Sequence, residues 1–218
     1  MKNEAQGVSQ TDEDATQSPR RKRNAAMTRQ AILDSARIAF TRFGYDGVGV
    51  REIAQDAGVT AMLVNRYFGS KEKLFEEVIE LSLSAPSVLR AELMVAGQQA
   101  DETGKNIAEK LIASSNPGLN PDGILILLRS AGSSQAAAIL RKHAMCNLET
   151  MIEYLPGENP EVRAALSIAL IAGFKLMRQI IAVPPLNNKD QSDLLQQLAR
   201  LFAVLVSDPD TTKAPSRG

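Results

Sequence analysis

Two neighbouring side chains, Asn65 and Arg66, have the chemistry best suited to reading a pattern of hydrogen bonds. They lie in residues 58–75, which read GVTAMLVNRYFGSKEKLF. An Asn amide can pair with adenine through two hydrogen bonds and an Arg guanidinium with guanine, each pair giving on the order of 1–3 kcal/mol of discrimination. Tyr67, Lys71 and the amide at the start of the next helix suit a phosphate group. These residue types suit contact with a nucleic acid, and the question is whether the surrounding elements present them together.

The other polar candidates indicate neither catalysis nor a bound metal. The single His143 precedes the single Cys146 by three residues, with Glu149 a further turn on. A metal site is conceivable, but a lone His and a lone Cys usually pack or face solvent, so we expect no metal and no cofactor. No Ser/His/Asp or paired-carboxylate motif surrounds the histidine. GYDGVGV, residues 44–50, has glycines spaced as in a dinucleotide loop, but no strand precedes it. We expect no enzymatic activity.

Composition gives no argument for a polyanionic partner, because 25 basic and 25 acidic residues leave the 218-residue chain with a formal net charge of zero. Any basic surface must therefore be local, and bases modestly outnumber acids between residues 20 and 80. A single cysteine excludes an intrachain disulfide and fits a reducing compartment. The N-terminus has no signal-peptide core, and the longest apolar run, residues 164–174, is too short to span a bilayer. We expect a cytoplasmic protein without a membrane partner.

Hydrophobic periodicity predicts an all-α fold, because apolar residues recur at helical spacing through most of the chain and no strand-like alternation of useful length occurs. Gly44 ends the first helix, Thr60 is a plausible N-cap, and Ser70 caps a long fourth helix. Asn120-Pro121-Asp122 and Asn159-Pro160-Glu161 each place Asn at the N-cap and Pro at the first helical position. The other expected helices cover residues 50–57, 61–67, 121–131, 134–154, 160–182 and 190–207.

The residues between the second and third helices are spaced as in a helix-turn-helix. Ala54 allows the second of the two helices to cross closely, Gly58 supplies a left-handed turn, and Val64 fills the angle between them. Ile53 and Val59 add apolar contacts. This arrangement holds two helices at the angle that places the second in a DNA major groove. An ordinary helical corner uses the same residues, so spacing alone leaves both readings open.

The segment from Ala31 to Val78, AILDSARIAFTRFGYDGVGVREIAQDAGVTAMLVNRYFGSKEKLFEEV, resembles the TetR (TetR/AcrR) family of transcriptional regulators. The resemblance implies an Ω-shaped homodimer whose third helices enter the major grooves of a palindromic double-stranded operator. It also implies release of the DNA by a small-molecule effector bound in the C-terminal domain. The marks that carry the resemblance are Ile32-Leu33, Phe40, Phe43-Gly44-Tyr45, Val50-Arg51-Glu52-Ile53-Ala54, Ala57-Gly58-Val59, Tyr67-Phe68 and Ser70-Lys71-Glu72.

The resemblance also implies roles for individual residues. The expected DNA-binding residues are Arg51, Thr60, Ala61, Met62, Asn65, Arg66, Tyr67 and Lys71. Among them Asn65 is favoured as a base reader, whereas Arg66 is a reader or a phosphate clamp. Val48 and Gly49 depart from the hydroxyl residues common at their positions, and this departure, like that of Leu63, puts particular phosphate contacts in doubt. Leu63 replaces a usual small or hydroxyl residue, and Asn65 replaces a common aromatic and so implies an operator of its own.

These inferences divide the chain into four parts. They are a disordered tail over residues 1–24, a helix-turn-helix domain over 25–85 with its motif at 49–68, a helical ligand-binding and dimerisation domain over 86–207, and a disordered tail over 208–218. The almost wholly apolar helix 160–182 and the leucine-rich stripe of helix 190–207 suit a four-helix dimer interface. An effector pocket is expected among helices between about residues 85 and 180, where a ligand would displace the fourth helix.

Three alternatives stay open at this point. The basic run Arg20-Arg21-Lys22-Arg23 is either an arm that reaches a minor groove or a solvated tail with nonspecific affinity. Met145, Met151 and Met177 either line a pocket or fill gaps in the core. Finally, the chain could be a helical ligand-binding or interaction protein whose helix-turn-helix is vestigial. Sequence-specific DNA binding that depends on Asn65 and Arg66 would separate this class from a DNA-binding regulator.

Overall fold

The computed structural model describes residues 14–83, 99–116 and 122–207, and within these ranges the chain forms helices and no strand, as predicted. The helices are α1 Asp14–Phe43, α2 Val50–Asp56, α3 Ala61–Phe68, α4 Lys71–Leu83, α5 Ala100–Ser114, α6 Asp122–Ser130, α7 Ser134–Ile152, α8 Pro160–Lys175 and α9 Ser192–Val206. A π-helical turn, Leu176–Ile180, follows α8, and a 3-10 turn, Pro184–Leu186, precedes α9. No helix in the described ranges combines the length and apolarity that a membrane crossing requires.

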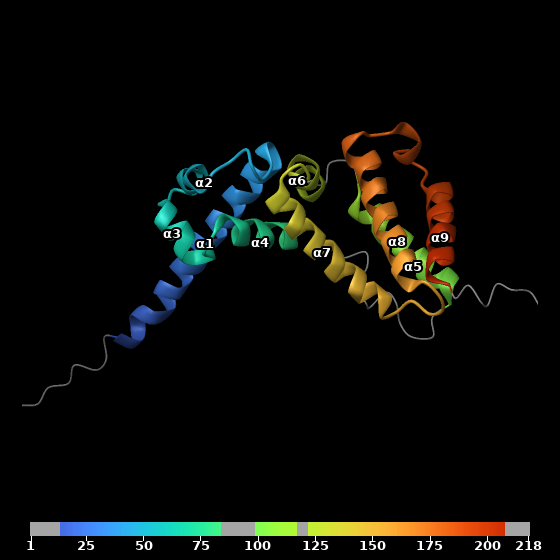
Figure 1. Ribbon diagram of the computed structural model, residues 1–218, viewed down its shortest axis with the longest axis horizontal. Helices are drawn as coiled ribbons and strands as arrows, with labels where there is room; N and C mark the ends of the chain where they lie inside the picture. The colour runs from blue at the N-terminus through green and yellow to red at the C-terminus, as the bar shows by residue number, and fades with distance from the viewer. Residues whose placement is uncertain (1–13, 84–98, 117–121, 208–218) are drawn as a thin grey trace, which may run out of the picture.

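Two hydrophobic cores lie at opposite ends of the molecule (Figure 1). The first joins the head, α1–α4, to α6 and the N-terminal half of α7, and the second joins α5, the C-terminal half of α7, α8 and α9. Within α7, Ala136 and Leu140 pack in the first core, whereas Leu148 and Met151 pack in the second. Helix α7 therefore packs in both cores and links them.

Ion pairs fasten α6 and α7 to the head. Arg37 of α1 pairs with Asp122 of α6, and Lys142 of α7 pairs with Glu76 of α4. The boundary predicted at residues 85–86 falls outside the described residues. The first core nevertheless continues well past it, because Ile126 of α6 is completely buried there.

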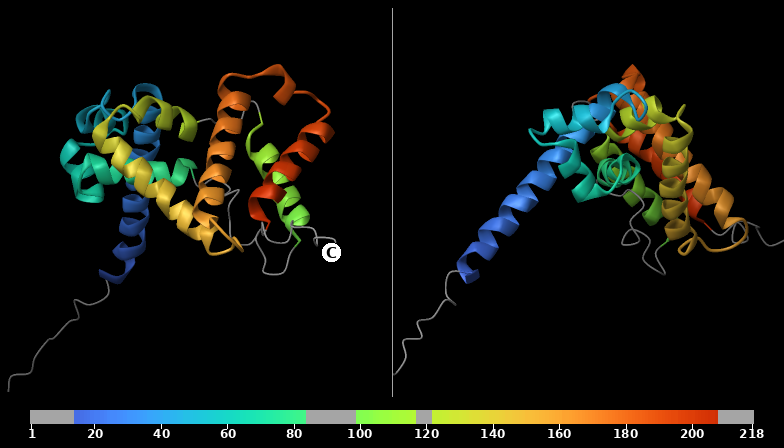
Figure 2. Two further views of the ribbon diagram at one scale, coloured as in Figure 1. Left: turned by 45° about the vertical axis from the view of Figure 1, so that its right-hand side comes forward. Right: turned by 60° about the vertical axis from the view of Figure 1, so that its left-hand side comes forward.

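Helix α1 corrects the predicted N-terminal tail. We expected disorder over residues 1–24, but α1 begins at Asp14 and includes the run Arg20–Arg23 (Figure 2). The segment lacks an apolar stripe, yet Arg, Lys and Ala are strong helix formers, so a helix anchored by packing further along can continue through them. Residues 1–13, and the tail predicted over 208–218, lie outside the described residues.

Helix α5 was not predicted. Its buried positions include Thr103 and Gly104, which interrupt the apolar pattern formed by Ile107 and Leu111. Gly104 is needed because α9 approaches closely: a Cβ atom there would lie 2.5 Å from the carbonyl oxygen of Ala199. Close backbone approach thus explains why a residue that is unfavourable in helices lies inside this one.

The end of α8 differs from the predicted helix 160–182. The helix starts as expected after Asn159, with Pro160 in its first turn, although Asn159 has φ 53° and its side chain makes no capping hydrogen bond. Regular α-helix stops at Lys175, the following π-helical turn ends at Ile180, and Ala182 just beyond it has φ 57°. Asn120 and Pro121 of the other predicted start lie outside the described residues. The remaining predicted helices are confirmed to within a few residues of their ends.

Candidate nucleic-acid interface

The crossing of α2 and α3 is fixed by the small and aliphatic residues that the sequence predicted for it. Ile53, Ala54 and Val64 are all buried in the first core. Gly58 has φ 67°, the left-handed conformation that favours glycine, and the Val59 amide donates to the Ala54 carbonyl at 2.9 Å to close the turn. The helix-turn-helix geometry is therefore held from inside the head.

Helix α3 has one face in the core and one in solvent. Thr60 caps it as predicted, since its hydroxyl oxygen accepts a hydrogen bond from the Leu63 amide at 3.3 Å. Val64 and Phe68 point into the core. The opposite side of the helix presents Asn65 and Arg66, both exposed, with Met62, which is 82% exposed.

This outer face combines hydrogen-bonding groups with an apolar contact. Ala61 lies half-buried at its start, and Arg51 is exposed near the start of the neighbouring α2. Thr60 is also exposed, although its oxygen is already used in the cap. An amide, guanidinium groups and a thioether on one short helix pair can contact base edges, phosphates and a thymine methyl group. Seven of the eight candidate residues therefore lie on α2, on α3 or at the α3 N-cap, and the eighth, Lys71, begins α4.

The last two candidates are packed more tightly. Tyr67 is half-buried against the first core. The Lys71 ammonium lies 4.3 Å from the centroid of the Tyr45 ring, a cation–π contact at the start of α4. The Lys71 ammonium must therefore leave the Tyr45 ring before it can contact a phosphate.

Tyr45 and Glu72 stabilise the start of α4, although the sequence marked them only as part of the family resemblance and gave neither a role. The Tyr45 hydroxyl donates to the Glu72 carboxylate at 2.9 Å. Burial, with the hydrogen bond and charge of Glu72, raises the pKa of Tyr45 to about 12, so the phenol stays a donor at neutral pH. The backbone amide of Glu72 and the hydroxyls of Ser70 and Tyr45 lower the pKa of the Glu72 carboxyl. Its carboxylate therefore remains an acceptor.

Arg29 is a second supporting residue that sequence reasoning missed. Its guanidinium carbon lies 4.8 Å from the centroid of the Phe68 ring, and its Nη2 donates to Glu77. One α1 side chain thus ties the end of α3 to α4. Nothing in the sequence separates this arginine from the other bases of the segment, because its role depends on which ring lies beneath it.

The two unusual residues before α2 have structural explanations. Val48 is buried in the first core, so it replaces a polar contact by packing. Gly49 is the N-cap of α2, and the Glu52 carboxylate accepts a hydrogen bond from its amide. Neither residue offers a side-chain donor to a phosphate.

Two family models match the chain. The model of bacterial regulatory proteins of the tetR family matches residues 32–78, and that of the tetracyclin repressor-like C-terminal domain matches residues 101–206. Together the matches cover more than half of the chain. The protein belongs to the tetR family. This confirms the resemblance predicted from the sequence and makes the chain a transcription regulator of a non-enzymatic, DNA-binding class.

Similar proteins agree with this assignment. The HTH-type transcriptional regulator AcrR of Shigella flexneri is 43% identical over 63 residues, which is 29% of each chain. The HTH-type transcriptional repressor AcnR of Corynebacterium efficiens is 42% identical over 48 residues, 22% of this chain and 26% of AcnR. The matches therefore span less than a third of either curated relative. The crystal structure of the TetR-family regulator SCO0857 from Streptomyces coelicolor covers 84% of this chain and 96% of its own, at 26% identity and a TM-score of 0.58.

This tetR-family chain exposes an apolar face at the end opposite the head. Val162, Leu166 and Met177 are exposed along α8 and its π-helical extension, and Leu201 and Val204 are exposed on α9. Figure 1 shows α8 and α9 together at that end. Several exposed large apolar side chains on two packed helices are typical of a surface that another protein covers. The sequence analysis expected the apolar helix α8 to lie in a dimer interface, and in the single chain these apolar side chains are uncovered.

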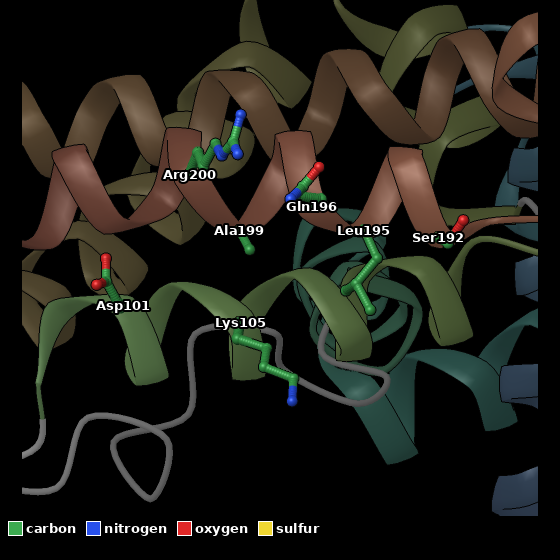
Figure 3. Close-up of a pocket in the computed structure, with 7 residues that line it drawn as sticks. All are labelled: Asp101, Lys105, Ser192, Leu195, Gln196, Ala199 and Arg200. Atoms are coloured by element: carbon green, nitrogen blue, oxygen red, sulfur yellow. The ribbon is translucent and has the colours of Figure 1, made fainter.

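Two shallow grooves follow the line between α5 and α9. One, of about 470 Å³, is lined by Asp101, Lys105, Ser192, Leu195, Gln196, Ala199 and Arg200 (Figure 3). The second, of about 440 Å³, continues along the same two helices and reaches Asn116. Both open to solvent and have mixed lining, so neither has the enclosed apolar walls usual for a drug-sized ligand.

The remaining sequence candidates have simpler explanations. Met151 is fully buried in the second core, whereas Met145 and Met177 are exposed, so the three methionines line no common pocket in the described part of the chain. Cys146 is exposed, and His143 is half-buried. Among the described residues, no group of three His, Cys, Asp or Glu side chains could hold a metal ion.

Proposed function

We propose that the protein is a homodimeric repressor that binds a palindromic operator and is released by a small molecule bound in the C-terminal domain. The observation that carries the proposal is the outer face of α3, where Met62, Asn65 and Arg66 are exposed on a helix whose other side is locked in the core. An 82% exposed methionine is unfavourable in water but suits contact with a thymine methyl group. We also propose a cytoplasmic location, because action on DNA requires access to the chromosome.

Dimerisation supplies two such helices. The exposed apolar face of α8 and α9 can meet the same face of a second copy across a two-fold axis, giving a four-helix interface. The two recognition helices would then lie about 34–36 Å apart, so each reads one half of a palindrome on the same side of the duplex. A monomer contacts only one half-site and therefore lacks the binding free energy that the second head would add.

Release is explained by the contacts of α4. This helix packs against α1, α6 and α7, and a Cβ atom on Gly123 of α6 would lie 2.7 Å from the Ser82 carbonyl oxygen of α4. The Glu76–Lys142 ion pair joins α4 to α7. A ligand that binds one arrangement of α6 and α7 more tightly would therefore shift α4 and the head with it.

Selection from a randomised duplex library tests the DNA-binding half of the proposal. We expect the purified protein to enrich two inverted half-sites whose centres are one helical turn apart. Fluorescence anisotropy on the enriched duplex should then show that Asn65→Ala and Arg66→Ala each weaken binding at least about tenfold, since each removes on the order of 1–3 kcal/mol per recognised base.

The matched control is Arg141→Ala, because Arg141 is exposed on α7 and distant in sequence from the head. It should bind the selected duplex like the unmodified protein. Failure to enrich any sequence, or equal binding by all three variants, would support the alternative of a vestigial helix-turn-helix.

A further inference from the structure

Arg178 is a completely buried cation whose guanidinium is mostly unpaired. It lies in the π-helical turn after α8 with 0% relative exposure. Its Nη2 donates to the Asn116 side-chain oxygen at 3.0 Å, but Nε and Nη1 are buried with no hydrogen-bond partner. The Phe174 ring centroid lies 5.6 Å from the guanidinium carbon. Because a guanidinium has five N–H donors and cannot lose its charge, most of its donors lack an acceptor.

No carboxylate of the described residues neutralises this charge. The ion pairs found there involve other bases, namely Arg29, Arg37, Lys105 and Lys142. Burial lowers the pKa of the Arg178 guanidinium, and no acidic side chain opposes that effect.

A second cation adds to the positive charge of this part of the domain. Lys175 lies three residues earlier on the same helix and is half-buried. Burial alone lowers the pKa of its ammonium. Within the described ranges, two partly or wholly buried cations therefore lie close in sequence without an acid between them.

The surrounding backbone compensates only in part. Asn116 follows the C-terminus of α5, where the helix dipole favours a cation, and the Gln179 amide donates to the Ser114 carbonyl at 3.5 Å. The Asn187 amide group donates to the Arg178 carbonyl, yet its own oxygen is buried without a partner. Native proteins rarely leave several buried polar atoms unpaired in one place unless a water, ion or ligand belongs there.

We propose that Arg178, supported by Lys175, receives the oxyanion group of the small-molecule effector, a carboxylate or a phosphate. The inference rests on the proposed release by a ligand and names the chemical class of that ligand. A planar oxyanion satisfies a guanidinium through charge-assisted hydrogen bonds. Asn116, whose side-chain oxygen accepts the hydrogen bond from Arg178, also lines the second α5–α9 groove, of about 440 Å³.

Thermal unfolding of the full-length protein tests the site directly. The probes are sodium benzoate against benzamide, which has a similar shape without the charge, and inorganic phosphate against chloride at equal ionic strength. At tenfold excess over its dissociation constant a bound anion should raise the unfolding midpoint by about 3–6 °C. A response to benzoate alone identifies a carboxylate site, a response to phosphate alone a phosphate site, and a response to both a general oxyanion site.

Variants assign the response to Arg178. Arg178→Met should lose the shift, and without added anion its midpoint should equal or exceed that of the unmodified protein, because an apolar side chain replaces an unpaired buried charge. Arg178→Lys keeps the charge without the planar fork and should respond weakly. Arg141→Met, on the exposed side of α7, should respond fully. The proposal is overturned if neither anion stabilises the protein at millimolar concentration, or if Arg178→Met responds like the control.

The same samples separate this site from the proposed release mechanism. If an anion stabilises the protein through Arg178 but leaves its affinity for the selected duplex unchanged, the oxyanion site stands and effector release through it fails. If Arg178→Met still folds but no anion binds the unmodified protein, the site fails while DNA binding is unaffected.

Discussion

Replacing Leu201 by aspartate should separate the two subunits of the proposed dimer without unfolding either one. Leu201 lies on the apolar face of α9 and is 51% exposed in the single chain. The aspartate can therefore point into solvent in the monomer. In the dimer the same position would be covered by the second copy.

The expected loss follows from that exposure. Burying a whole leucine side chain contributes about 2 kcal/mol, so covering the exposed half contributes about 1 kcal/mol. Placing a carboxylate there adds a desolvation cost of at least about 1 kcal/mol even after relaxation. Because a two-fold axis repeats the change, the dimer loses at least about 4 kcal/mol, or roughly a thousandfold in its dissociation constant.

Sedimentation velocity over a concentration series measures this constant, and anisotropy on the selected duplex reports the accompanying loss of affinity. Leu128→Asp is the matched control, since Leu128 is 46% exposed on α6 and lies away from the apolar face of α8 and α9. It should leave the dimer intact. The reasoning is refuted if Leu201→Asp dimerises as tightly as the unmodified protein, or if Leu128→Asp dissociates equally.

Three further substitutions test the fold around the sites. Gly104→Ala should lower the free energy of unfolding, measured by urea titration, by about 2 kcal/mol or more, because the new Cβ would lie 2.5 Å from an α9 carbonyl oxygen. The control Gly132→Ala should be nearly neutral, because no non-neighbouring atom of the described residues lies within 4 Å of the added Cβ. Ala182→Gly should stabilise by up to about 1 kcal/mol, since φ 57° is strained for alanine, and a lower midpoint would contradict this. Burial lowers the pKa of His143 below its usual 6.5, so as the pH falls the unfolded state takes up the proton first and the free energy of unfolding decreases below pH 6.5. His143→Gln should lack this part of the acid dependence.

The head was predictable because its geometry is recorded in short, local patterns. Ala54, Gly58 and Val64 had the roles assigned to them, and Thr60 and Ser70 cap their helices through hydrogen bonds to nearby amides. Each of these interactions joins residues within about ten positions of one another. A single sequence can therefore reveal them.

The misses depended on contacts between residues far apart in the chain. Helix α5 escaped because Gly104 looks like a helix breaker until α9 is seen against it. Arg29 supports α3 only because the Phe68 ring lies beneath it. Arg178 was not singled out in the sequence, but it lies buried in a π-helical turn and donates to Asn116 just after α5. Nothing periodic in the sequence encodes these approaches.

The position of α7 bears on how a ligand in the second core could act on the head. Its N-terminal half packs with Ile126 in the first core and its C-terminal half with Met151 in the second, so the helix cannot shift in one core without disturbing the other. Close-packed cores favour a few discrete arrangements over continuous deformation. An oxyanion at Arg178 would therefore act only if it binds one arrangement of α8 more tightly than another. Lys142, which pairs with Glu76 of α4, is the contact through which α7 would transmit that preference to the helix-turn-helix.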